Sequence, residues 1–211
     1  MSKYHVSLEE VQHIAVATVA LAFAFSLILN RDVVFGGNLF FQGYKLSYFT
    51  DALIAVGLAF TLHELAHKFV AQKKGLWAEF RAWPMGLLMA VGLAVITKGG
   101  FVFAAPGATM ISNIRKSPFG FSSRSIDLKD MGIIGISGPV VNVILTAAFL
   151  PFAAMGFQLA IVTAQVNAWL AIFNMIPISL LDGAKVWQWS KSIWIGFFAL
   201  CIGMFAITLM V

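Results

Sequence analysis

The sequence carries little charge for its length. Only 11% of its 211 residues are charged and 60% are hydrophobic, whereas soluble proteins average about 25% charged residues. The mean hydropathy is +0.90, and the apolar residues lie in long blocks between short polar joints. These features exclude an ordinary soluble domain. They predict an all-α polytopic membrane protein in which residues 1–211 form a single membrane-embedded domain.

Cysteine is nearly absent, and histidine is scarce. The single Cys201 cannot form a disulfide within the chain or build a cysteine-rich zinc site, so any metal must be held by histidine and carboxylate. Of the four histidines, we interpret His5 and His13 as interfacial residues rather than ligands. The net charge is +5, but the basic residues are scattered at the block edges. We therefore expect contacts with the lipid bilayer and no nucleic-acid binding.

Five apolar blocks are long enough to cross a bilayer, which takes about 20 residues. They are residues 11–29, 50–72, 133–155, 158–181 and 192–211. A sixth block, residues 84–96, begins with Pro84 and is short for a crossing, so it suits a re-entrant segment. The sequence therefore predicts about five to six transmembrane helices. "FVFAAPG", residues 101–107, follows two glycines and suggests a membrane-edge strand, with an ordinary loop as the alternative.

Lysine and arginine predict the orientation. Lys73 and Lys74 follow the second block and mark a cytoplasmic end. If residues 84–96 do not cross, all but two of the 14 Lys and Arg residues lie on the cytoplasmic side, and only Arg31 and Lys45 lie outside. This bias favours the re-entrant interpretation. It predicts a multi-pass protein of the plasma membrane with residues 180–185 on the cytoplasmic side.

"HELAH", residues 63–67, places ionisable side chains where hydrocarbon is expected. Residues four apart share one helix face, so His63 and His67 can direct ring nitrogens at one zinc ion. Glu64 is turned by about 100 degrees and can serve a zinc-activated water as general base. The alternative is a helix whose polar groups only hydrogen-bond within the bundle.

A catalytic zinc takes three protein ligands and keeps one open position. Asp182, in "NMIPISLLDGAK", is the candidate third ligand because it lies at the cytoplasmic end of the fourth block. Pro177 removes a backbone hydrogen bond and opens the helix just before it. Asp182 can share an ion with His67 only if residues 84–96 do not cross. The alternative is an aspartate in a solvated turn.

These motifs resemble the site-2 protease family of intramembrane zinc metalloproteases, whose signatures are H-E-x-x-H and N-x-x-P-x-x-x-L-D-G. The matching residues are His63, Glu64, His67, Asn174, Pro177, Leu181, Asp182 and Gly183. "SGPVVN", residues 137–142, also resembles the family's G-P-x-x-N segment through Gly138, Pro139 and Asn142. The resemblance covers a catalytic core of about residues 50–185.

The resemblance implies cleavage of a transmembrane helix of a membrane-protein substrate, with one Zn²⁺ per chain. It implies His63, His67 and Asp182 as zinc ligands and Glu64 as general base. Asn142 and Asn174 would be substrate or oxyanion contacts, and the glycine-led strand would pair with an unwound substrate. Two alternatives stay open: a catalytically inactive zinc-binding scaffold, and a metal-ion transporter that uses the same ligands. The oligomeric state is not indicated.

Overall fold

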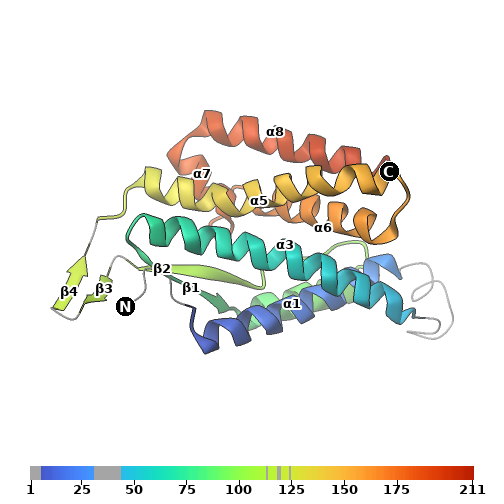
Figure 1. Ribbon diagram of the computed structural model, residues 1–211, viewed down its shortest axis with the longest axis horizontal. Coiled ribbons are helices and arrows are strands. Elements are labelled where there is room, and N and C mark those ends of the chain that lie inside the picture. The colour runs from blue at the N-terminus through green and yellow to red at the C-terminus, as the bar shows by residue number, and fades with distance from the viewer. Residues whose placement is uncertain (1–5, 31–43, 113, 118–119, 124) are drawn as a thin grey trace.

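The computed structural model describes residues 6–30, 44–112, 114–117, 120–123 and 125–211. Within this part of the chain, four helices are long and apolar enough to cross a membrane: α1 (Leu8–Leu29), α3 (Leu46–Lys73), α5 (Leu128–Ala154) and α8 (Lys191–Thr208). They match four of the five expected spans. The predicted helical membrane protein with a small β element is confirmed (Figure 1). His5 and Arg31 lie outside the described residues.

The fourth expected span, residues 158–181, is wrong in its last part. Helix α6 (Gln158–Asn174) ends seven residues earlier, an irregular segment follows, and the short helix α7 (Asp182–Trp189) begins at the candidate ligand. Pro177 is the cause, because proline lacks the N–H of a helical hydrogen bond and disfavours helical backbone in the residue before it. This break lets the chain turn Asp182 inward.

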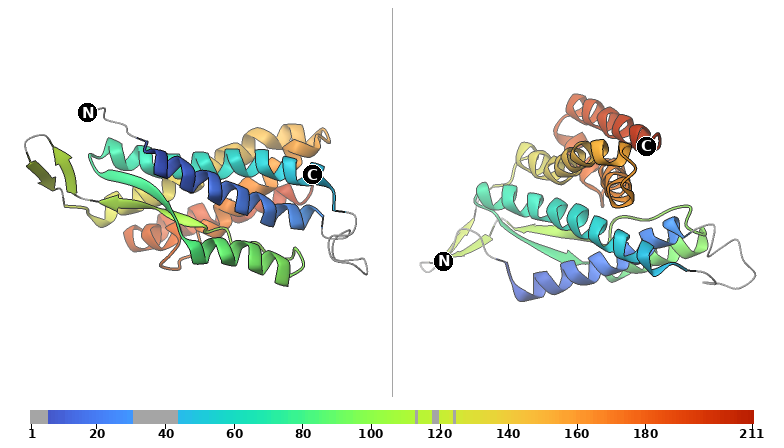
Figure 2. Two further views of the ribbon diagram at one scale, coloured as in Figure 1. Left: turned by 90° about the horizontal axis from the view of Figure 1, so that it is seen from below. Right: turned by 45° about the vertical axis from the view of Figure 1, so that its right-hand side comes forward.

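The long helices alternate in direction along the molecule. Figure 1 shows α8 outermost, then α5 with α6, then α3, and α1 on the opposite side. The C-terminal ends of α3 and α6 therefore lie at the same end of the bundle. Figure 2 shows α5, α6 and α8 as one group packed on the group of α1, α3 and α4, with α3 contacting both α5 and α6.

Residues 77–112 form a loop that leaves one end of the bundle and returns to it. The loop contains β1 (Trp77–Ala82), α4 (Pro84–Ile96) and β2 (Gly107–Ser112). The two strands are antiparallel, with Trp77 opposite Ser112 and Ala82 opposite Gly107. Because both ends of the loop lie side by side, α5 begins at the end of the bundle where α3 stops. The re-entrant interpretation required this arrangement.

The strand expected at residues 101–107 is displaced. Residues 101–106 have no strand, and β2 begins at Gly107. The reason lies in the partner: β1 stops at Ala82 because Pro84 begins α4, so the chain before Gly107 has no strand to pair with. A second, unpredicted hairpin of β3 (Ile114–Ser117) and β4 (Gly120–Ser123) follows.

The loop penetrates farther than the lysine count assumed. A Cβ on Gly99 would lie 2.7 Å from the carbonyl oxygen of Leu27, so the end of α4 reaches the C-terminal end of α1. A strand rises about 3.3 Å per residue against about 1.5 Å for a helix. Together β1 and α4 therefore extend roughly 40 Å, although α4 alone is short. Lys98 thus lies at the end of the bundle opposite Lys73. The sequence interpretation had counted both lysines on the same, cytoplasmic side.

Candidate metal centre

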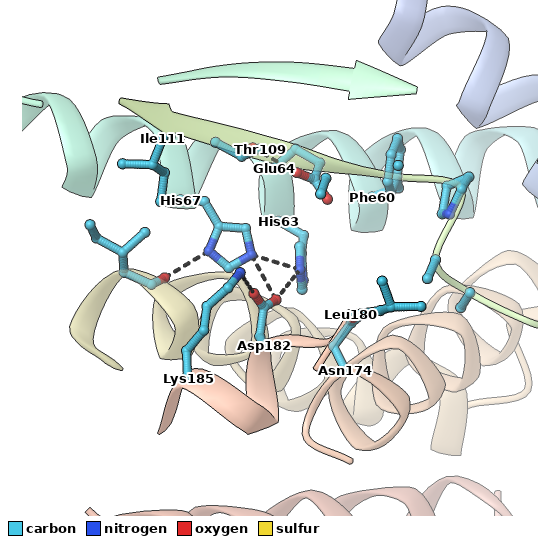
Figure 3. A pocket seen from close by; sticks show the side chains of 16 residues that line it. Phe60, His63, Glu64, His67, Thr109, Ile111, Asn174, Leu180, Asp182 and Lys185 are labelled. Atoms are coloured by element: carbon cyan, nitrogen blue, oxygen red, sulfur yellow. Dashed lines mark hydrogen bonds and ion pairs between the residues drawn. The ribbon is translucent and has the colours of Figure 1, made fainter. Parts of the chain in front are cut away.

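Three side chains from two helices meet at the end of the bundle where α3 and α6 terminate. His63 and His67 point from α3, and Asp182 points from the first turn of α7 (Figure 3). The two Nε2 atoms are 3.0 Å apart, and Asp182 Oδ2 lies 3.2 Å from His63 Nε2 and 2.9 Å from His67 Nε2. All three residues are buried. The structure therefore brings together residues separated by more than a hundred positions in sequence.

The outer nitrogens of both imidazoles are already used. His63 Nδ1 lies 2.6 Å from Asn142 Oδ1, and His67 Nδ1 lies 2.7 Å from the carbonyl oxygen of Ile134. Since both partners are oxygen acceptors, each Nδ1 carries the proton and each Nε2 presents a lone pair. Hydrogen bonds of this kind fix the tautomer and orientation of metal-binding histidines.

The inner atoms fit a zinc ion. Two imidazole nitrogens and a carboxylate oxygen converge, an arrangement that a shared cation would stabilise. A tetrahedral zinc with bonds of about 2.0–2.1 Å separates its ligand atoms by roughly 3.3 Å. The observed separations of 2.9–3.2 Å are close to this value. His63, His67 and Asp182 could therefore hold one metal ion.

Asn142 and Gly138 support the cluster from α5. Asn142 is fully buried, and its Nδ2 donates to the carbonyl oxygen of Ala59 and to Asn167 Oδ1. Its Oδ1 is thereby oriented toward His63. A Cβ on Gly138 would lie 2.5 Å from His67 Nε2 and 2.6 Å from His63 Nε2. Glycine at this position gives the two imidazoles the space that an alanine methyl group would occupy.

Glu64 lies beside the cluster and faces the hairpin. Thr109 Oγ1, on β2, donates a hydrogen bond of 2.8 Å to Glu64 Oε2. Both residues line a pocket that also contains the three candidate ligands and Asn174. Thr109 was not singled out in the sequence, because its proximity depends on a hairpin that the sequence pattern did not reveal.

Lys185 is a second residue that sequence reasoning missed. Its Nζ donates a 2.8 Å hydrogen bond to Asp182 Oδ1, which leaves Oδ2 for the histidines. Burial by itself would lower the pKa of Lys185, but the charge of Asp182 and this hydrogen bond raise it above the ordinary value. The spacing of three residues within one helical turn was the available signal.

Asn142 and Asn174, expected as substrate or oxyanion contacts, occupy different positions. Asn174 lines the pocket, and its Nδ2 donates to the carbonyl oxygen of Leu170. Asn142 lies behind His63, away from the pocket lining. Asn142 is therefore positioned to orient His63. Asn174 instead faces the space where a substrate could bind. His13, expected at the interface, accepts a hydrogen bond from the backbone of Ala82.

Two curated proteins align with most of this chain. A protein of Methanocaldococcus jannaschii named "Putative zinc metalloprotease MJ0611" is 32% identical over 200 residues, which cover 92% of this chain and 91% of the relative. A protein of Bacillus subtilis named "Putative zinc metalloprotease YwhC" is 28% identical over 169 residues, or 69% of this chain and 71% of the relative. No family model and no solved structure matches the sequence.

Proposed function

The chain belongs to a family of zinc metalloproteases, and we propose that it is an intramembrane protease of the site-2 type. Its substrates would be membrane proteins, cut within a transmembrane segment. The observation that carries this proposal is the meeting of His63, His67, Asp182 and Glu64 in one buried pocket between helices that can cross a membrane. His63 lies ten residues before the end of α3, or roughly 15 Å along the helix.

We assign one Zn²⁺ per chain to His63, His67 and Asp182. When bound, zinc polarises a carbonyl group and lowers the pKa of a water molecule to about 7. Glu64 is placed to accept the proton of the attacking water and to return it to the leaving amine. The hydrogen bond from Thr109 holds one carboxylate oxygen, so the other oxygen stays available for proton transfer. Asn174 is assigned to the substrate or its oxyanion.

The free edge of β2 supports a substrate-binding role for the hairpin. Trp83 N–H donates to the carbonyl oxygen of Pro106; the paired backbone groups of β2 are therefore those of its even-numbered residues. Alternation then directs the backbone groups of Gly107, Thr109 and Ile111 away from β1. These three residues line the pocket. A substrate helix must unwind to expose its carbonyl groups, and an unwound segment can add to this edge as a third strand.

We place the protein in the plasma membrane as a multi-pass protein with its pocket toward the cytoplasm. The argument is the positive-inside rule: Lys73 and Lys74 end α3, and Lys129 begins α5, at the end of the bundle that holds the metal centre. A site at this end would cut a substrate near the cytoplasmic side of its transmembrane segment. Its partners would then be that substrate and the surrounding lipid.

Two other uses of the same ligands were open from the sequence. A catalytically inactive zinc scaffold needs no carboxylate beside the ion, and a metal-ion transporter needs further ligands along a path. The relatives, which are named as metalloproteases, favour neither. Among the described residues, His63, His67 and Asp182 form the one group of three or more such side chains that could hold a metal.

Replacing the general base tests the proposal. Wild type and Glu64→Gln are reconstituted in liposomes with a single-span model protein whose Leu/Ala segment carries an Asn-Pro pair near its cytoplasmic end. Wild type with zinc is expected to cleave the segment. Glu64→Gln is expected to bind zinc normally and to cleave at least about 100-fold more slowly, because general acid–base catalysis contributes factors of that size.

The matched control is Asp51→Asn, which neutralises a carboxylate of the same helix away from the pocket lining. It is expected to cleave at the wild-type rate. A Glu64→Gln protein that cleaved as fast as wild type would contradict the mechanism. Zinc flux through the same liposomes without any peptide cleavage would instead support the transporter.

A further inference from the structure

Three side chains on one face of α3 point toward the β1–β2 hairpin. Phe60, Glu64 and Lys68 are spaced by four residues, so they form a stripe along the helix. The ring of Phe60 packs edge-on against Phe80 of β1, with ring centroids 5.4 Å apart. Glu64 accepts the hydrogen bond from Thr109 of β2. Phe80 and Thr109 are direct cross-strand partners, so these two contacts fall on one rung of the hairpin.

Lys68 reaches the same rung through Glu10 of α1. Glu10 Oε2 accepts a hydrogen bond from Lys68 Nζ, and Glu10 Oε1 accepts one of 3.0 Å from the backbone N–H of Phe80. Glu10 is 1% exposed and Lys68 is 4% exposed. Taking two charges out of water is costly, and a buried ion pair is weak support for stability. What this pair does connect is α1, α3 and one strand of the hairpin.

Helix α1 also closes the outer edge of β1. His13 Nδ1 accepts a hydrogen bond of 3.3 Å from the N–H of Ala82, two residues beyond Phe80. Glu10 and His13 therefore satisfy successive outward N–H groups that a third strand would otherwise take. The opposite edge of the sheet, on β2, lines the pocket. The hairpin can thus accept an added strand on the pocket side alone.

We infer that the Lys68–Glu10 pair is a positioning device that sets the register of the β1–β2 hairpin on α3. It thereby decides which peptide bond of a substrate strand on β2 lies at the metal centre. This inference rests on the proposed function. Side chains of a strand alternate between the two faces of the sheet. If β1 slid by two residues along α1 and α3, every side chain would stay on its own face, so the alternation of side chains does not prevent such a slide. The bond from the N–H of Phe80 to Glu10 opposes it, and the longer bond from the N–H of Ala82 to His13 acts in the same direction.

The test compares two neutral double variants, so that neither leaves a charge buried alone. Glu10→Met/Lys68→Met keeps the side-chain volume and removes the hydrogen bonds. Glu10→Gln/Lys68→Gln keeps an acceptor for Phe80 N–H and a donor toward residue 10. Both are assayed with the single-span model protein described above, and the ends of the products are identified by mass spectrometry.

The methionine pair is expected to add cleavage at bonds two residues from the wild-type bond and to lower kcat/KM about tenfold, with unchanged zinc affinity. The glutamine pair is expected to restore cleavage at the single wild-type bond. Asp51→Asn, which lies on α3 before the residues that contact the hairpin, is the control and should cut as wild type does. A merely structural role would lower the rate without moving the bond.

Amide hydrogen exchange gives a second measurement that needs no substrate. The methionine pair is expected to speed exchange in residues 77–82, and the glutamine pair is not. A methionine pair that cuts only at the wild-type bond, or that leaves exchange in residues 77–82 unchanged, overturns the inference. Failure of wild type to cut the model protein counts against the proposed function instead, and the exchange measurement still decides on the register.

Discussion

Asn142 shows that a residue found by its motif can have a structural partner that the motif does not indicate. The G-P-x-x-N resemblance identified it, and the family implied contact with substrate. In the structure its Oδ1 accepts from His63 Nδ1, and its Nδ2 is used by Ala59 and Asn167. Both ends of this side chain are thus held in a buried network, and Asn142 is not among the residues that line the pocket. Its contribution is to aim His63 at the metal centre.

Removing each asparagine in turn should separate the two roles. Asn142→Ala is expected to weaken zinc binding 10–100-fold, the usual cost of losing the partner that orients a histidine ligand. Asn174→Ala is expected to bind zinc as wild type does and to cleave the model protein more slowly. Zinc affinity is measured by competition with a chelator, and thermal unfolding checks that both variants fold. Unchanged zinc affinity in Asn142→Ala would contradict the orienting role.

Helix α5 carries glycines at three positions along the face that meets the site. A Cβ on Gly132 would collide with the ring of Trp189, one on Gly135 would lie 3.1 Å from Lys185 Cβ, and one on Gly138 would collide with both histidines. The spacing of three residues keeps them on one face. These glycines let α7 and α3 approach α5 closely, which brings Asp182 to the histidines.

The long helices could be predicted from the sequence, and the hairpin could not. Twenty consecutive apolar residues have few alternatives to a membrane helix, so α1, α3, α5 and α8 were expected nearly at their observed bounds. "WAEFRA" in β1 lacks a regular alternation of apolar and polar residues, and Glu79 and Phe80 are both buried. A strand that is packed against helices on several sides shows no alternation of apolar and polar residues. The hairpin was therefore not predicted, and neither was the hydrogen bond from Thr109 of β2 to Glu64.

A proline on the free edge of β2 should test strand addition. Ile111 has its backbone N–H directed away from β1, so Ile111→Pro removes no hydrogen bond of the hairpin, and proline is tolerated at such edges. It does remove a donor that an added substrate strand would use. We expect zinc binding and thermal unfolding near wild type, with cleavage of the model protein reduced at least about tenfold, since a lost hydrogen bond of about 1.5 kcal/mol has that effect.

Ile111→Ala is the matched control, because it loses the same side chain and keeps the N–H. Its cleavage rate should stay well above that of Ile111→Pro. Equal rates for the two variants would show that the side chain matters and that strand addition at this position does not occur.

The metal centre requires that the chain cross the bundle an even number of times between His67 and Asp182. From the sequence, this number could be inferred only from the distribution of charges. Four helices and α6 alternate in direction, and the loop of residues 77–112 returns to its starting end. His67 and Asp182 can therefore meet. The lysine count reached the same parity while misplacing Lys98, because it treated α4 as too short to cross and ignored the extended strand before it. The lysine count therefore gave the direction of the later helices as the structure has it, although it underestimated how far the loop extends along the bundle.

The placement of Lys98 can be tested by cysteine labelling in intact cells that express the protein. The background is Cys201→Ser, since the native cysteine is buried. Lys98→Cys and Lys129→Cys place a thiol at two exposed positions that the fold assigns to opposite ends of the bundle. By the positive-inside rule, the end with Lys129 is cytoplasmic. A membrane-impermeant maleimide is therefore expected to label Lys98→Cys from outside and Lys129→Cys only after permeabilisation. Labelling of both from the same side would contradict the path of the loop, because α4 would then stop short of the far end of α1.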